Sequence, residues 1–151
     1  MKHRFENHDL VTERASQLID VTADVRAAVE RAEIVNGMVL VYSPHTTCAI
    51  VINELESGFL EDFGDLLDEL APSQGRYYRH DDLEIRTEGL EEDTADFPNG
   101  HSHVRTGLLA SSSQTVPIVE GELMLGPWQR IFFCELDRSR SRKVFIQVIG
   151  E

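Results

Sequence analysis

The chain has 151 residues, of which 41% are hydrophobic, enough for one domain with a substantial core. Its formal net charge of -13 argues against a nucleic-acid-binding protein, because such a protein needs a basic surface to displace counterions from phosphates. No apolar stretch reaches the roughly 20 residues of a membrane span, and no apolar segment follows the charged N-terminus as in a secretory signal. We therefore expect no nucleic-acid partner and no membrane partner.

Two cysteines, Cys48 and Cys134, lie in apolar, strand-like stretches, and neither has a CxxC partner. Buried reduced thiols in a cytoplasmic protein are the expectation for such residues. Charge is distributed unevenly: residues 54–70 and 80–96 are strongly acidic, whereas residues 138–143 contain three arginines and a lysine. A basic cluster on an acidic protein indicates either an anion site or solvated surface charge.

The first half of the chain predicts strands and two helices. Short alternating stretches in residues 2–19 predict one or two strands. Apolar residues at helical spacing then predict an amphipathic helix over residues 22–35, with Thr22 as its N-cap. Residues 38–42 and 48–52 are rich in β-branched residues and predict two buried strands. Residues 55–70 return to helical spacing with an acidic outer face, and Pro72 ends that helix.

The second half predicts loops, one short helix and four strands. Tyr77-Tyr78 is a candidate short strand, and the acidic stretch over residues 80–96 is expected to be a loop that folds over another part of the molecule, with the question of a lid left open. Asn99 is positioned to cap a helix that runs to Leu109. Residues 114–119, 122–125, 130–136 and 143–149 predict strands separated by turns. The fold class is therefore α+β: one domain over residues 1–151, with an antiparallel strand-rich sandwich and a few helices.

Several side chains are candidates for chemistry. His45 precedes two hydroxyl residues, Thr46 and Thr47, at the end of a strand. An imidazole there can bind a metal or transfer a proton, and the hydroxyls can bind an anion. A histidine that hydrogen-bonds within a turn is the alternative. Glu54 closes the second strand, where a carboxylate can be a general base, a metal partner or a charge at a helix start.

The densest polar stretch contains His101 and His103. On a helix these two side chains diverge by about 200°, so only one of them can point into a given site. With Asn99 as the cap, we expect His103 to point inward and His101 to be peripheral. His80 is followed by two aspartates and is either a ligand supported by a carboxylate or part of an exposed loop. None of the spacings matches an HExxH or CxxC module.

Nucleophilic catalysis finds no support. The sequence has no GxSxG elbow, and both cysteines lie in apolar stretches where a thiolate is disfavoured.

Four segments in order match the motifs of one family. They are His45-Thr46-Thr47-Cys48-Ala49 through Asn53-Glu54, Asn99 through His103-Val104-Arg105, Thr115-Val116-Pro117-Ile118 through Trp128-Gln129-Arg130-Ile131, and Glu135-Leu136-Asp137 through Arg142. Together they resemble the YjbQ-like family, often labelled secondary thiamine-phosphate synthase. The chain departs from the family pattern at Ser139, where a glycine-proline turn is usual, and at Gly100, where alanine is frequent and the change is expected to be minor.

The resemblance implies a compact α+β homotrimer with a histidine cluster near a subunit boundary. The implied metal ligands are His45, His80 and His103. The implied catalytic residues are His45, Glu54 and His103. Thr46, Thr47, Arg105 and Arg142 are the implied contacts to substrate or phosphate.

The family label implies transfer of a hydroxymethylpyrimidine from its pyrophosphate to a thiazole phosphate, with release of pyrophosphate. Such a reaction uses a divalent metal and basic side chains on the leaving group. Carboxylates such as Glu54, Asp81 and Asp82 suit Mg²⁺, whereas three histidines suit Zn²⁺. The alternative hypothesis is a metal-binding protein with an unknown ligand or hydrolytic reaction. A third is a trimeric structural protein whose polar cluster only stabilises the interface.

Overall fold

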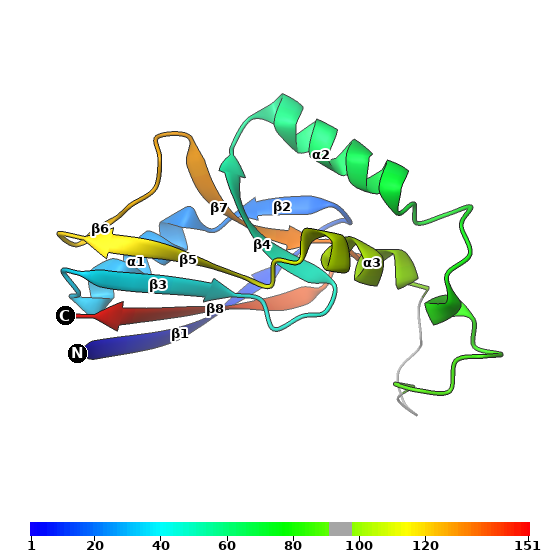
Figure 1. Ribbon diagram of the computed structural model, residues 1–151, viewed down its shortest axis with the longest axis horizontal. Helices are drawn as coiled ribbons and strands as arrows, with labels where there is room; N and C mark the ends of the chain where they lie inside the picture. The colour runs from blue at the N-terminus through cyan, green and yellow to red at the C-terminus, as the bar shows by residue number, and fades with distance from the viewer. Residues whose placement is uncertain (91–97) are drawn as a thin grey trace.

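Two antiparallel sheets form the frame of the molecule in the computed structural model, which describes residues 1–90 and 98–151 (Figure 1). The larger sheet has the strand order β1 (Lys2–Val11), β8 (Ser141–Gly150), β3 (Gly37–Tyr42), β5 (Ser113–Val119) and β6 (Glu122–Leu123). The smaller sheet has the order β2 (Gln17–Asp20), β7 (Gln129–Glu135) and β4 (Cys48–Glu54). Apart from the candidate strand at Tyr77-Tyr78, the expected strands are confirmed, and the two that flank residues 43–47 belong to different sheets.

The larger sheet is buried on one face only. Val39 and Val41 on β3 point inward, and Val148 and Ile146 lie opposite them on β8. The intervening residues point outward because side chains alternate along a strand. Phe145 contacts the rings of Phe5 and Tyr42 on that outer face, and Phe5, Met38, Tyr42 and Ile149 are exposed there. The outer face of the larger sheet therefore carries exposed apolar side chains that no other described part of the chain covers.

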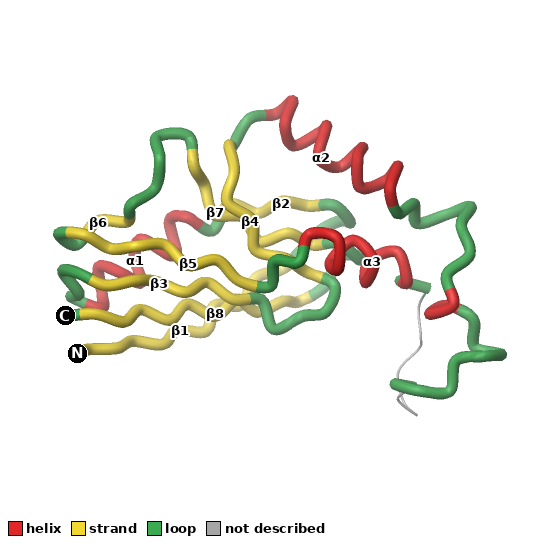
Figure 2. The backbone as a smooth tube through the Cα atoms, viewed as in Figure 1, coloured by secondary structure: helices red, strands yellow, loops and turns green. Residues whose placement is uncertain are grey.

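The smaller sheet is buried on both faces. Cys48, Ile50, Ile131 and Phe133 face the larger sheet and the helix α1 (Thr22–Ala32). The opposite face is covered by α2 (Ser57–Leu70) and α3 (Gly100–Leu109), as the tube in Figure 2 shows. Strands buried on both faces read as continuous apolar runs, and this explains the sequence patterns over residues 48–52 and 131–134. The molecule is a single compact α+β domain.

Two helix ends differ from the prediction. Thr22 is the first residue of α1 rather than its N-cap, and its hydroxyl accepts a hydrogen bond from the Ile131 amide at 2.8 Å. The Asp20 carboxylate accepts from the Thr22 amide instead, at 2.9 Å. The helix ends at Ala32 because Glu33 adopts a left-handed conformation with φ of 51°. At α2, the Glu56 carboxylate caps the helix by accepting from the Gly58 and Phe59 amides.

The long connection between α2 and α3 contains a short 3-10 helix, η1 (Arg79–Asp81). The candidate strand at Tyr77-Tyr78 is wrong, because neither residue pairs with another strand. The proposed lid over residues 80–96 falls partly outside the described residues, so its prediction is not tested.

No helix in the described ranges is long and apolar enough to cross a membrane. Both cysteines are buried as free thiols, and burial raises the pKa of each to about 12.

Candidate functional site

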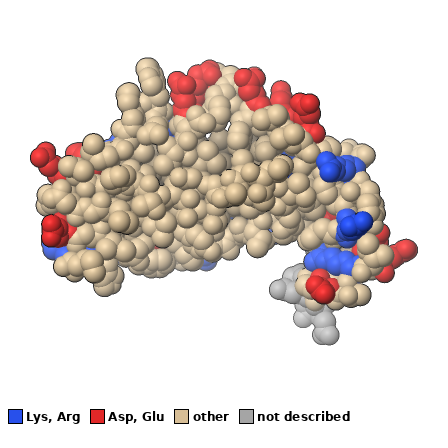
Figure 3. Space-filling model, in the orientation of Figure 1, with Lys and Arg blue, Asp and Glu red and all other residues tan. Residues whose placement is uncertain are grey.

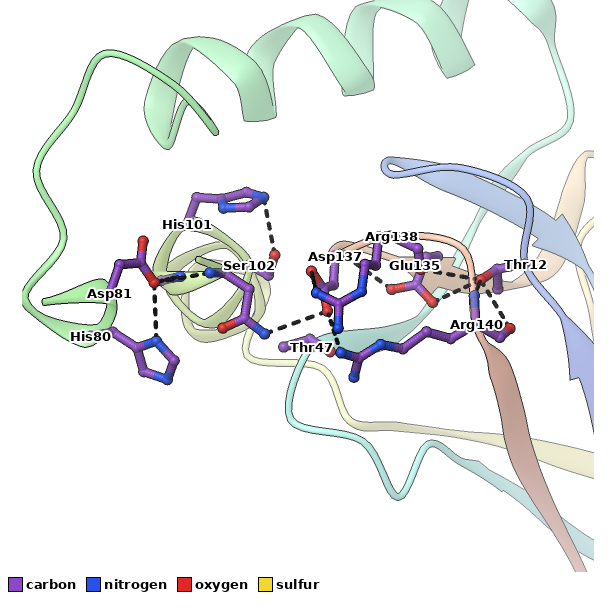
Figure 4. A network of polar contacts seen from close by, with 12 residues as sticks. Thr12, Thr47, His80, Asp81, His101, Ser102, Glu135, Asp137, Arg138 and Arg140 are labelled. Atoms are coloured by element: carbon purple, nitrogen blue, oxygen red, sulfur yellow. Dashed lines mark hydrogen bonds and ion pairs between the residues drawn. The ribbon is translucent and has the colours of Figure 1, made fainter. Parts of the chain in front are cut away.

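The buried ion pair between Glu135 and Arg142 joins the two sheets at one end of the sandwich. Figure 4 shows Glu135 among its neighbours Thr12 and Asp137. Arg142 donates from Nε to Glu135 Oε2 at 2.6 Å and from Nη2 to Oε1 at 2.8 Å. The Thr12 hydroxyl and the Asp137 amide each donate to the same carboxylate at 3.0 Å. Arg142 also donates to the Thr47 hydroxyl at 3.2 Å. Glu135 is fully buried, so this network fixes the β7–β8 connection and the end of the β3–β4 loop.

Asp137 extends the network from the ion pair toward α3. Its carboxylate is almost fully buried and lies 3.9 Å from Arg138 and 3.6 Å from Arg140. The side-chain amide of Asn99 donates to it at 3.4 Å. Arg138 and Arg140 remain about one-third exposed, so positive charge reaches solvent beside the start of α3.

His80 and His103 form a stacked pair beside Asp81. The two imidazole centroids are 4.4 Å apart with an interplanar angle of 37°. His80 Nδ1 lies 3.2 Å from Asp81 Oδ1, which leaves Nε2 of His80 available to another group. Burial and the neighbouring His80 lower the pKa of His103, so its imidazole is neutral at pH 7. Neutral, carboxylate-supported imidazoles are the form that binds metals or accepts protons.

Asp81 also sets the position of α3. Its Oδ1 accepts from the Asn99 and Gly100 amides at 2.9 and 2.8 Å. Asn99 is the N-cap residue of α3 as expected, and its carbonyl accepts from the Ser102 amide at 2.9 Å, but its side chain makes no capping hydrogen bond. Burial opposes ionisation of Asp81, but hydrogen bonds from Gly100, His80 and Asn99 outweigh it and lower the pKa of this carboxyl.

Gly100 allows η1 to approach α3 closely. A Cβ atom at this position would lie 2.6 Å from the Tyr78 Cβ and 3.2 Å from the His80 Cβ. An alanine here is therefore not a minor change, since it pushes η1 away from the helix. We expect Gly100→Ala to lower the free energy of unfolding by about 1–3 kcal/mol in urea titrations. Gly107→Ala is the matched control, because nothing lies within 4 Å of that Cβ position in the same helix. The free energy of unfolding of Gly107→Ala should rise slightly, because alanine favours a helix more than glycine does. An equal loss of stability in both variants would contradict the close-approach explanation.

The orientation predicted for the histidines of α3 is wrong. His101 is the more buried of the two, only 6% exposed, whereas His103 is half-buried beside His80. The His101 ring lies on the side of α3 that faces α2 (Figure 4) and contacts the Tyr78 ring. Its Nε2 lies 3.1 Å from the Ser102 hydroxyl. Burial and the charge of Arg105 lower the pKa of His101.

His45 lies at the other end of the polar network. Its Nε2 accepts a hydrogen bond from the Lys143 amide at 2.9 Å, which places the ring proton on Nδ1. Burial and the Arg142 charge lower the pKa of His45, so the ring is neutral at pH 7. Neither ring nitrogen then offers a free lone pair, and the arrangement favours a hydrogen-bond donor over a metal ligand. In the described part of the chain, no three His, Cys, Asp or Glu side chains group into a metal site.

The remaining candidate residues are distributed as follows. Arg105 is 1% exposed, and its guanidinium donates to the Ala71 carbonyl, the Ser16 hydroxyl and the Asp68 carboxylate. Glu54 is exposed at the far end of β4 from Cys48, about 20 Å along the strand. Thr46 is exposed on the loop beside His45, and Thr47 is buried against Arg142. The fold therefore gathers His80 and His103, places His45 and Thr47 around the ion pair, and keeps Glu54 away from both within one chain.

Stability should fall when the pH is lowered from about 7 to 5. The pKa values of His45, His101 and His103 are all lowered in the folded protein, whereas an unfolded histidine has a pKa of about 6.5. Below about pH 6.5 the unfolded chain then binds more protons than the folded chain. Linkage therefore lowers the free energy of unfolding as the pH falls. Urea titrations in the presence of a chelator measure the effect. His103→Gln should reduce the change in the free energy of unfolding with pH, and His3→Gln should leave that change as it is. A free energy of unfolding that stays constant or rises toward pH 5 would contradict the account.

Sequence reasoning alone did not single out Glu135 and Asp137 as the centre of the network. The available signal was a pair of carboxylates directly after an apolar strand, followed by arginines at 138, 140 and 142. Buried carboxylates require such partners, so a charged residue that ends a buried strand predicts an ion pair.

Comparison with known proteins agrees with this fold. A model of the family described as UPF0047 protein, YjbQ-like, matches residues 6–151. A UPF0047 protein of Archaeoglobus fulgidus is 39% identical over 140 residues, covering 93% of this chain and 97% of that protein. The UPF0047 protein YugU of Bacillus subtilis is 33% identical, covering 92% and 94%.

Solved structures superpose over nearly the whole chain. A hypothetical protein from Aeropyrum pernix K1 has a TM-score of 0.82 at 34% identity, covering 98% of this chain and 99% of that one. A protein of unknown function from Sulfolobus solfataricus has a TM-score of 0.79 at 32% identity, covering 99% of each chain. This chain therefore belongs to the UPF0047 family of YjbQ-like proteins.

Proposed function

We propose that this protein is a metal-dependent enzyme that acts on a small phosphorylated molecule, with His80 and His103 as protein ligands of the metal. The observation that carries the proposal is the stacked pair itself, with a carboxylate behind one ring. A carboxylate hydrogen-bonded to a histidine fixes the orientation of the ring and raises the basicity of its other nitrogen.

The donor set identifies the class of metal. Two imidazoles fit Zn²⁺ or a similar transition ion, whereas Mg²⁺ prefers oxygen ligands. The remaining coordination positions would be filled by water, by the substrate or by a carboxylate of a second subunit. A metal bound in this way supplies a Lewis acid that withdraws charge from a phosphate oxygen.

Residues elsewhere on the polar network supply the remaining functions in the proposal. Arg138 and Arg140 bring positive charge to solvent next to Asp137 and would bind the phosphate groups. His45 would donate the proton on Nδ1 to a substrate oxygen. Arg142 and Arg105, proposed from the sequence as phosphate contacts, are occupied by Glu135 and by Asp68, Ser16 and Ala71, so we assign them to positioning instead.

The reaction proposed within this class is thiamine phosphate synthesis. The bond between the pyrimidine methylene carbon and the pyrophosphate oxygen breaks, the thiazole nitrogen takes that carbon, and pyrophosphate leaves with the electron pair. The partly exposed arginines beside Asp137 support this choice, because a pyrophosphate leaving group requires positive charge. A hydrolytic reaction on another phosphorylated molecule is the alternative within the same class.

We also propose that the protein assembles as a homotrimer in the cytoplasm. The uncovered apolar face of the larger sheet, with Phe5, Met38, Tyr42 and Ile149 exposed, supports assembly. Two buried reduced thiols support a reducing compartment. Sedimentation equilibrium tests the trimer, and a mass of one chain would refute it.

Cobalt titration tests the metal site directly. Co²⁺ bound by imidazoles absorbs visible light, so a saturable absorption band at about one ion per chain is the expected result. His80→Ala and His103→Ala should each abolish the band, whereas the control His3→Ala, on the exposed part of β1, should retain it. A band that survives both variants would refute the ligand assignment.

A separate assay tests the reaction. Purified protein supplied with the two heterocyclic substrates and a divalent metal should form thiamine phosphate and pyrophosphate above a heat-inactivated control. Arg140→Ala should weaken substrate binding while leaving the cobalt band intact. If no product forms although the cobalt band is present, the reaction is wrong and the metal site stands.

A further inference from the structure

A second concave site lies between α2, the loop that joins β1 to β2, and α3. It is an open cleft of about 640 Å³, within the range of small-molecule sites. Its lining includes Arg14 and Ser16 from the loop, Glu61, Gly64 and Asp65 from α2, and His101 from α3. The stacked pair of His80 and His103 does not line this cleft, so the cleft is distinct from the proposed metal site.

The charges in the cleft are of both signs. Glu61 and Asp65 are four residues apart and therefore project from the same face of α2. Figure 3 shows acidic side chains gathered over this helix. Neither carboxylate has an ion-pair partner among the residues that the structure describes, whereas Asp68, one turn further on, is paired with Arg105. Arg14 lines the cleft from the loop and likewise has no ion-pair partner in the described ranges.

A largely buried imidazole also borders the cleft. The His101 side chain is more than nine-tenths buried, and its ring lies on the side of α3 that faces α2 (Figure 4). One ring nitrogen, Nε2, is bonded to the Ser102 hydroxyl, and Nδ1 has no hydrogen-bond partner within the described part of the chain. Because the His101 ring lines the cleft, Nδ1 is the atom through which this side chain can hydrogen-bond to a molecule bound there.

We propose that this cleft binds a small zwitterion of the amino-acid type. Its ammonium group would bind Glu61 and Asp65, its carboxylate would bind Arg14, and His101 Nδ1 would hydrogen-bond to a polar atom between them. A purely anionic molecule would be repelled by the two carboxylates. A purely cationic molecule would leave the Arg14 guanidinium without a partner and lose that contact.

Ligand chemistry is tested with 5-aminopentanoate and two relatives that each carry one charge, pentylamine and pentanoate. We expect saturable shifts of backbone amide NMR signals in the lining segments with 5-aminopentanoate, and binding about tenfold weaker or worse with each relative. Equal binding of pentylamine would show simple attraction to an acidic helix and overturn the proposal. No saturable shift up to about 50 mM, beyond the millimolar range of weak specific binding, would also overturn it.

Two glycine variants test the location. Nothing lies within 4 Å of a Cβ at Gly64, so Gly64→Met extends into the cleft without a clash and should abolish the shifts. Gly107→Met is the matched control, since it places the same side chain on open surface of α3 outside the lining. It should retain full binding. Retention of binding in Gly64→Met, confirmed as folded by its NMR spectrum, would refute the site, and the cobalt band of both variants should stay unchanged.

Discussion

Arg142→Met should destabilise the protein by about 3–5 kcal/mol, measured as the free energy of unfolding in urea. The reason is that Glu135 is fully buried and receives two charge-assisted hydrogen bonds from Arg142. Without the guanidinium, this carboxylate must either stay charged without a counterion or bind a proton, and both cost free energy.

Two further variants separate this explanation from a simple loss of packing. Arg142→Met combined with Glu135→Leu should recover much of the loss, because replacing both partners removes the unpaired charge. Arg130→Met is the matched surface control. Its guanidinium lies 3.8 Å from Asp20 at a partly exposed position, so the change should cost about 1 kcal/mol or less. A loss below about 1 kcal/mol in Arg142→Met would contradict the central role of this pair.

Arg105→Met should cost about 2–3 kcal/mol in the same measurement. The Arg105 side chain is 1% exposed and donates to the buried carbonyl of Ala71 at 2.9 Å. Loss of a charge-assisted hydrogen bond, with its acceptor left buried, accounts for this magnitude. A second donation, to the Ser16 hydroxyl at 2.9 Å, ties α3 to the loop between β1 and β2.

Asp68→Asn is the control for Arg105. Asp68 is 64% exposed, so solvent screens its ion pair and its replacement should cost about 1 kcal/mol or less. Equal losses in the two variants would show that the ion pair, rather than the buried hydrogen bonds of Arg105, holds α3 in place.

Much of the fold follows from local patterns. The apolar run rich in β-branched residues over residues 38–42 identifies β3, and the helical spacing over residues 55–70 identifies α2. What local patterns do not determine is which strands pair. Residues 38–42 and 48–54 have similar compositions, yet β3 and β4 lie in different sheets, because the loop over residues 43–47 crosses the sandwich.

The candidate site was only partly predictable. The sequence identified His80 and His103 as candidates, and the fold brings these two rings together. The predicted orientation of His101 was wrong. Which side of a short helix is buried depends on the elements that pack against it, and the His101 ring lies on the side of α3 that faces α2. Capping of α3 by Asp81 was also beyond local reasoning, since this carboxylate lies 18 residues before Asn99.

The roles of the arginines depended on long-range contacts. Nothing local distinguishes Arg142 from Arg140 in the basic segment over residues 138–143. The sandwich brings Arg142 of β8 against Glu135 at the end of β7, whereas Arg140 stays at the solvent edge beside Asp137. Charge clustering in the sequence thus indicated an anion site without showing which cations are available to a ligand.

Metal content measures the central proposal most directly. Protein purified without a metal-affinity tag or a chelator should carry about one zinc-like ion per pair of His80 and His103, quantified by inductively coupled plasma mass spectrometry. His103→Ala purified in the same way should carry none, and His3→Ala should match the unaltered protein. Metal retained in His103→Ala at the level of the unaltered protein, or no transition metal in either, would contradict a metal centre built on these two histidines.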